Sequence, residues 1–121
     1  MAKRTGDEVE RCPAVSTLQR MIGGKWKIEI LFYIGFKGVS RFGQLRRCIG
    51  TVSESTLSKQ LRELADDGFI ERIDHGEVPP RVEYRLTPRG HSFVPILEEM
   101  KAWGERELDL SLSVDQEEDP R

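Results

Sequence analysis

Hydroxyl and cationic side chains in residues 53–67 are spaced so that they would share one side of a helix. Leu57, Leu61 and Leu64 follow the i, i+4, i+7 spacing that places apolar groups on a single stripe. At about 100° per residue, the opposite side carries Ser55, Ser58, Lys59 and Arg62. Such groups hydrogen-bond to base edges and phosphates, and a helix fits the major groove of DNA. The alternative is an ordinary surface helix, whose outward side is polar in any soluble protein.

Other constellations of reactive side chains are missing from the sequence. The two cysteines, Cys12 and Cys48, form no C-x-x-C pair, and the two histidines, His75 and His91, lack metal-ligand spacing. There is no glycine-rich phosphate loop and no G-x-S-x-G nucleophile motif. We therefore expect no catalytic site, no metal site and no cofactor, and we do not expect an enzyme.

The charge distribution is compatible with a nucleic-acid partner. The 121 residues suffice for one domain with a modest core, and the net charge is −2. Residues 41–62 nevertheless carry five cations and one acidic residue, whereas residues 98–121 carry nine acidic residues and three cations. A local basic surface can bind phosphate on an acidic protein, so the net charge does not exclude DNA.

Composition also predicts the location of the protein and the boundaries of its domain. No apolar run approaches the roughly 20 residues that a membrane span needs, and no secretory signal leads the sequence, so we expect a cytoplasmic protein without a membrane partner. Residues 1–11 lack a periodic apolar pattern and are predicted to be a flexible arm. Residues 111–121 are predicted to be an acidic, disordered tail, which leaves 12–110 as the domain.

Three helices are predicted ahead of the polar-faced helix. Cys12-Pro13 opens the first, because proline is favoured at the first helical position, and Gly23-Gly24 ends it. The second runs from residue 25 to about 34 and is apolar on most sides, which predicts a place at the centre of the core. Gly35 and Gly38 are expected to form the turn before a short third helix. With the polar-faced helix, that short helix would make a helix-turn-helix unit.

Strands and a last helix follow. Residues 69–74 and 81–86 are predicted to form a hairpin with Pro79-Pro80 in its loop, and a helix-turn-helix followed by a hairpin is a winged helix. The hairpin is the wing of such a fold, and the tip of the wing can reach phosphates or the minor groove of DNA. A helix from Thr87 to about residue 110 should bend at Pro95. With Val94, Leu97, Trp103 and Leu108 it carries more apolar surface than one small core needs, and the excess suggests a helix–helix contact with a second subunit.

Several motifs match one family in order along the chain. They are Cys12-Pro13, Ile22–Lys27, Arg41-Phe42, Leu57, Gln60–Leu64, Asp67-Gly68, Glu77–Tyr84 and Leu86-Thr87. From Cys12 to Gly104 the sequence resembles the HxlR-type winged-helix transcription regulators, relatives of the MarR type. The resemblance implies an α+β, mainly helical fold: a winged helix-turn-helix domain with N- and C-terminal dimerisation helices. It also implies a homodimer that binds a palindromic operator in double-stranded DNA. Gly43, where a small polar cap is usual, and Cys48, where a basic residue is commoner, depart from the pattern.

The resemblance suggests roles for individual residues. The polar-faced helix would be the recognition helix, which enters the major groove. Its first turns would read bases through Ser55 and Ser58, whereas Lys59 and Arg62 would contact phosphates. Arg41, Arg46 and Arg47 are candidates for further phosphate contacts, and the sequence cannot assign both Arg46 and Arg47 to this role. In the wing, Arg81 at the base and His75 at the tip could enter the minor groove. The alternative is that Arg81 pairs with the neighbouring carboxylates of Glu77 and Glu83.

Cys12 is the candidate residue for sensing oxidants or electrophiles. At a helix N-terminus beside Arg11, N–H dipoles and a cation favour a thiolate. Some HxlR-type proteins use a cysteine at this position to sense oxidants, electrophiles or aldehydes, so modification of Cys12 could alter operator affinity. The alternative is a buried cysteine that packs as a small apolar residue, and packing is also the expected role of Cys48, with a resolving thiol as its alternative. Two other functions stay open: a winged helix that binds only proteins, and a DNA-binding regulator controlled by a small ligand of unknown identity.

Overall fold

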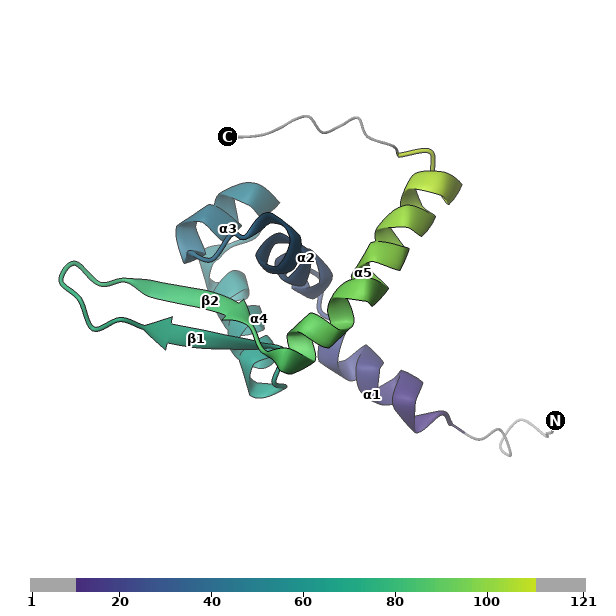
Figure 1. Cartoon of the computed structure of the whole chain (residues 1–121), viewed down its shortest axis with the longest axis horizontal. Coiled ribbons are helices and arrows are strands. Elements are labelled where there is room, and N and C mark those ends of the chain that lie inside the picture. Colours follow the sequence, from purple (N-terminus) through teal and green to yellow (C-terminus); the bar gives the residue numbers. More distant parts are fainter. Residues whose placement is uncertain (1–10, 111–121) are drawn as a thin grey trace.

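The computed structural model describes residues 11–110, which form five helices and one two-stranded antiparallel sheet (Figure 1). In chain order the elements are α1 (Pro13–Ile22), α2 (Lys27–Lys37), α3 (Phe42–Ile49), α4 (Glu54–Asp66), β1 (Ile70–Asp74), β2 (Val82–Leu86) and α5 (Pro88–Glu107). The predicted α+β winged helix is confirmed. The predicted arm (apart from Arg11) and the predicted tail lie outside the described residues.

Helix α2 lies at the centre of the core, as predicted. It contacts α3, α4, α5 and β2, and its Ile30, Leu31 and Ile34 are buried. Its bounds differ from the prediction at both ends. The turn at residues 24–26 precedes the helix, and Gly35 lies inside the helix instead of in the following turn. A Cβ on Gly35 would lie 3.1 Å from a methyl group of Leu86, so the glycine lets α2 approach the sheet closely.

The helix-turn-helix consists of α3, the turn at residues 50–53 and α4. Gly50 has a positive φ of 94°, which glycine adopts without a side-chain clash. The Ser53 hydroxyl accepts a hydrogen bond of 3.1 Å from the Thr56 N–H and so caps α4 as its residue type predicts. Arg41 occupies the N-cap position of α3 without a side-chain capping hydrogen bond. Gly43 is the second residue of the helix and therefore does not cap it.

The hairpin places one face against the helices and the other toward solvent. Ile70 pairs with Leu86 at the end nearest the core, and both are buried. Arg72 and Tyr84 are the next pair on the same face, whereas Glu71 and Arg85 oppose each other on the other face. Figure 1 shows the hairpin projecting away from the helical body.

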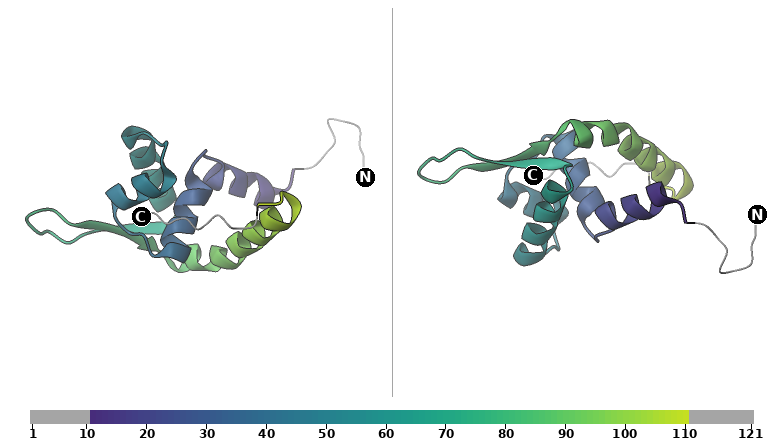
Figure 2. Two further views of the ribbon diagram at one scale, coloured as in Figure 1. Left: turned by 90° about the horizontal axis from the view of Figure 1, so that it is seen from above. Right: turned by 90° about the horizontal axis from the view of Figure 1, so that it is seen from below.

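Helices α1 and α5 project from the domain on the side opposite the hairpin (Figures 1 and 2). No residue of α1 is buried within the chain, although its sequence is amphipathic. Helix α5 contains Pro95 and curves along its length in both views of Figure 2, in agreement with the predicted bend. Within residues 11–110, no helix combines the length and apolar character that crossing a membrane requires.

Candidate nucleic-acid interface

The outward face of α4 presents the predicted polar side chains to solvent. Ser55, Ser58, Lys59 and Arg62 are all exposed. Neither Lys59 nor Arg62 forms an ion pair with any carboxylate of residues 11–110, so both cations are free for an external anion.

Three leucines hold α4 against the core from behind. Leu57, Leu61 and Leu64 are almost completely buried, as their spacing predicts. Burial of one leucine side chain contributes roughly 1.5–3 kcal/mol to folding. The polar face of α4 is therefore positioned by a rigid apolar contact rather than by its own solvent interactions.

Polar contacts fix the second half of α4 to Trp26 and to the first residue of α2, and the sequence reasoning missed them. The Trp26 N–H donates to Gln60 Oε1 at 3.0 Å, and Lys27 Nζ lies 2.8 Å from Glu63 Oε1. Lys27 is only 4% exposed and also donates to the Met21 carbonyl at 3.3 Å. The hydrogen bond from Lys27 lowers the pKa of Glu63 below its usual value, and the positive charges of Lys27, Lys59 and Arg62 lower this pKa further. The available signal was a lysine at the start of a largely apolar helix.

The arginines around α3 differ in their surroundings. Arg46 Nε donates to the Val52 carbonyl at 3.3 Å, so this side chain stabilises the turn between α3 and α4. Arg41 and Arg47 are exposed and form no ion pair within the described part of the chain. The sequence could not separate Arg46 from Arg47, whereas their contacts do.

The wing cations are paired with carboxylates. Arg81 binds Glu77 through two hydrogen bonds of 2.9 and 3.0 Å and lies 3.5 Å from Glu83, while His75 Nε2 lies 3.0 Å from Glu83. The hydrogen bond from Arg81 lowers the pKa of Glu77, and the contact with His75 lowers the pKa of Glu83. The ion-pair alternative for Arg81 is therefore confirmed.

The predicted positions of the wing cations were wrong. The backbone N–H of His75 donates to the backbone carbonyl of Arg81 at 2.9 Å, so the two residues face each other where the strands end and the loop begins. Neither is at the tip or at the base. The loop between them contains Val78, which is 97% exposed.

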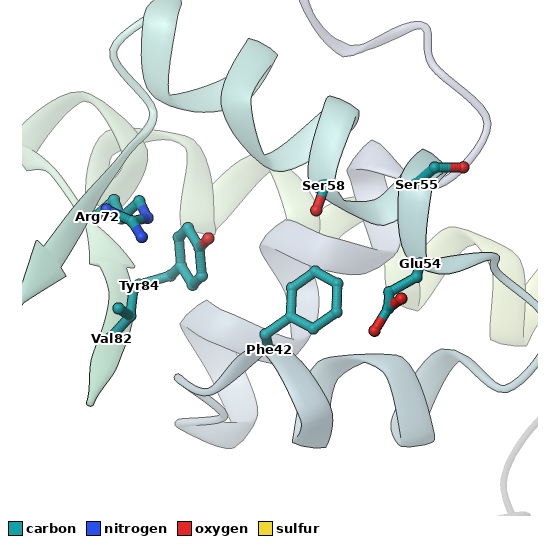
Figure 3. A pocket seen from close by; sticks show the side chains of 7 residues that line it. All are labelled: Phe42, Glu54, Ser55, Ser58, Arg72, Val82 and Tyr84. Atoms are coloured by element: carbon teal, nitrogen blue, oxygen red, sulfur yellow. The ribbon is translucent and has the colours of Figure 1, made fainter. Parts of the chain in front are cut away.

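A groove of about 420 Å³ separates α4 from the hairpin (Figure 3). Its lining combines polar and apolar side chains of α3, α4 and both strands: Phe42, Glu54, Ser55, Ser58, Arg72, Val82 and Tyr84. Arg72 was missed by the sequence reasoning. The signal was the strand alternation, which places Arg72 on the same face as the buried Ile70.

Both cysteines are exposed in the single chain, so neither packs in its core as the packing interpretation expected. Cys12 is the N-cap of α1, and its carbonyl accepts hydrogen bonds from the N–H and the hydroxyl of Ser16. Cys48 lies on α3. Among the described residues, no three histidine, cysteine or acidic side chains are grouped so that they could hold a metal ion.

The fold and this surface define a class of protein, the winged helix-turn-helix transcription regulators. The model of the HxlR-like helix-turn-helix family matches residues 21–111. The chain therefore belongs to the HxlR family. Its relatives include the uncharacterized HTH-type transcriptional regulator YybR of Bacillus subtilis, 46% identical over 101 residues, which are 84% of this chain and 79% of YybR. The uncharacterized HTH-type transcriptional regulator BH0655 of Halalkalibacterium halodurans is 46% identical over 84 residues, 69% of this chain and 74% of the relative.

Solved structures of regulators are similar as well. The redox regulator HypR in its oxidized form superposes with a TM-score of 0.72 and 41% identity, over 78% of this chain and 96% of HypR. Its reduced form has a TM-score of 0.72 and 43% identity, over 80% of this chain and 95% of HypR. The resemblance to HxlR-type regulators is thus confirmed, and membership of a helix-turn-helix family implies DNA binding.

Proposed function

We propose that this protein is a sequence-specific DNA-binding transcription regulator that acts in the cytoplasm as a homodimer on a palindromic operator, and that it has no catalytic activity. One observation carries the proposal: Ser55, Lys59 and Arg62 lie exposed on a helix whose other side is buried in the core. A helix held in this way can enter a major groove without rearrangement.

In the complex, the exposed cations would bind the DNA backbone while the start of α4 reads bases. Ser55, in the first turn of α4, is the base-reading candidate. Lys59 and Arg62 on α4, with Arg41 and Arg47 beside α3, would contact phosphates. Arg81 and His75 would contact DNA only by sharing or exchanging their carboxylate partners, so we assign them a smaller contribution.

The second subunit would cover the apolar surface of α1 and α5. Val15 and Leu18 on α1 and Ile96, Met100 and Trp103 on α5 are exposed in the single chain, and Trp103 is 54% exposed. Exposed apolar side chains concentrated on two projecting helices are typical of a subunit interface. A twofold arrangement would present two α4 helices to two half-sites about one DNA turn apart.

Cys12 is the proposed sensor of this regulator. The thiol is exposed at the start of α1, one of the two proposed dimer helices, and the chain is similar to a redox regulator in both its oxidized and reduced forms. Hydrogen peroxide would transfer one oxygen atom to the Cys12 thiolate, giving a sulfenic acid and hydroxide. A polar modification at the dimer helix would change the spacing of the two α4 helices and hence the affinity for the operator.

Protection of genomic DNA fragments tests the proposal. The full chain is incubated with fragmented genomic DNA under reducing conditions, and bound fragments are mapped by footprinting. We expect protected half-sites with twofold symmetry. If no DNA fragment is protected and the protein binds only other proteins, the alternative of a winged helix that binds only proteins replaces the proposed function.

A further inference from the structure

Three groups that can bind an anion converge in the groove between α4 and the hairpin. Arg72 on β1 and Tyr84 on β2 are cross-strand partners, and Ser58 of α4 lines the same groove. In Figure 3 the Ser58 hydroxyl points into the space between α4 and Tyr84, whereas the Ser55 hydroxyl points away from it. Ser58 therefore faces the hairpin, and Ser55 faces outward.

Arg72 is the strand arginine without a carboxylate partner. Arg85, on the other face of the sheet, lies 3.1 Å from Glu71, but no carboxylate of residues 11–110 lies within ion-pair distance of Arg72. Asp74, on the same face, accepts a hydrogen bond of 2.9 Å from the Gly76 N–H in the turn. The exposed Arg72 guanidinium is thus free to bind an external anion.

The position of the groove identifies that anion, given that α4 and the hairpin bind DNA as proposed above. If α4 enters a major groove and the hairpin tip reaches the adjacent minor groove, one sugar-phosphate backbone must cross the space between them. We propose that Arg72, together with the hydroxyls of Ser58 and Tyr84, binds one phosphate of this backbone. Arginine suits the role because its planar guanidinium binds phosphate through two parallel hydrogen bonds. Ser58 then positions the protein instead of reading a base.

Glu54 determines where in the groove the phosphate lies. Its carboxylate lines the same groove and would repel a phosphate placed beside it. In Figure 3 the Phe42 ring lies between Glu54 and Tyr84. The phosphate therefore occupies the end of the groove formed by Arg72 and Tyr84.

Two arginine variants on opposite faces of the hairpin test this site. The affinity of Arg72→Gln and of Arg85→Gln for a mixed-sequence DNA duplex is measured over a range of salt concentrations. The duplex has about 30 base pairs, so that it spans about three turns. We expect Arg72→Gln to lose about tenfold in affinity and about one unit of the salt slope, because one phosphate contact is lost. Arg85→Gln removes the same charge from the outer face and should behave like the wild type.

Conservative variants separate geometry from charge. Arg72→Lys should keep the salt slope but recover only part of the affinity, because lysine binds phosphate as a point charge. Tyr84→Phe should weaken binding a few-fold without changing the slope.

The outcomes separate this site from DNA binding itself. If the wild type binds DNA in a salt-sensitive way and Arg72→Gln matches it, the phosphate site is wrong while DNA binding stands. Altered preference at one base pair, with unchanged binding to mixed sequence, would make Arg72 a base-reading residue and also overturn the proposal. If the wild type does not bind duplex DNA at all, the proposed function itself fails.

Discussion

Lys27 Nζ lies 2.8 Å from Glu63 Oε1 and 3.3 Å from the Met21 carbonyl, so one buried ammonium group contacts both α4 and the last turn of α1. A Cβ on Gly24 would lie 3.0 Å from the Lys27 side chain and 3.1 Å from that of Gln60, so a larger residue here would require one of these side chains to shift. The first residue of α2 and the glycine turn before it are thereby packed against α4.

This contact predicts how stability depends on pH. Lys27 lowers the pKa of Glu63 in the folded protein, so the stabilisation is present above the unfolded value of about 4.3 and is lost as the pH falls through the folded pKa. We expect the free energy of unfolding of Glu63→Gln to fall less steeply than that of the wild type between about pH 5 and pH 3. Denaturant titrations at each pH measure the difference. In a Lys27→Met background, Glu63→Gln should change the slope much less, because the Lys27 hydrogen bond is the largest cause of the lowered pKa and Lys59 and Arg62 contribute less. An undiminished change would contradict the role of Lys27.

Oxidant response should depend on Cys12. We expect peroxide to change the operator affinity of the wild type by at least about tenfold, a coupling of about 1.4 kcal/mol. Cys12→Ser should bind like the reduced wild type and should not respond. Gel-shift titrations with and without reductant measure the effect. A Cys12→Ser variant that still responds contradicts the sensor role, and loss of response in Cys48→Ser would show that both thiols take part.

Association of two chains should depend on the outward side of α5. Trp103→Glu places a charge in the proposed interface, and we expect it to shift sedimentation from dimer to monomer because an unpaired charge is costly to bury. Lys101→Gln is the matched control, since it changes the net charge by the same single unit and residue 101 lies about 200° away around the same helix. A Trp103→Glu protein that remains dimeric would place the interface elsewhere.

The arrangement of elements could be predicted because each had a local signal. Leucine spacing determined which side of α4 is buried, and strand alternation with the proline-containing loop indicated the hairpin. Contacts between distant segments had no such signal. Gly35 looked like a turn residue but lies inside α2, because close packing against Leu86 outweighs the low helix propensity of glycine.

The candidate site was predicted less completely for the same reason. Helix periodicity alone predicted that Lys59 and Arg62 are exposed on α4. The pairing of Arg81 with Glu77, the hydrogen bond of Arg46 to the turn and the free state of Arg72 depend on side-chain positions that spacing does not determine. Residue type identifies candidate cations, but only their contacts separate those that are free from those already paired.

The salt dependence of DNA binding tests the central claim most directly. Affinity for the mixed-sequence duplex is measured across salt concentrations for the wild type, for Lys59→Ala and for Lys101→Ala, whose ammonium group pairs with Glu105 on α5. We predict that the wild-type affinity falls linearly on a logarithmic salt scale, that Lys59→Ala lowers the slope by about one unit, and that Lys101→Ala leaves it unchanged. Salt-insensitive binding by the wild type, or an unchanged slope in Lys59→Ala, would contradict the assignment of α4 as the DNA-binding helix.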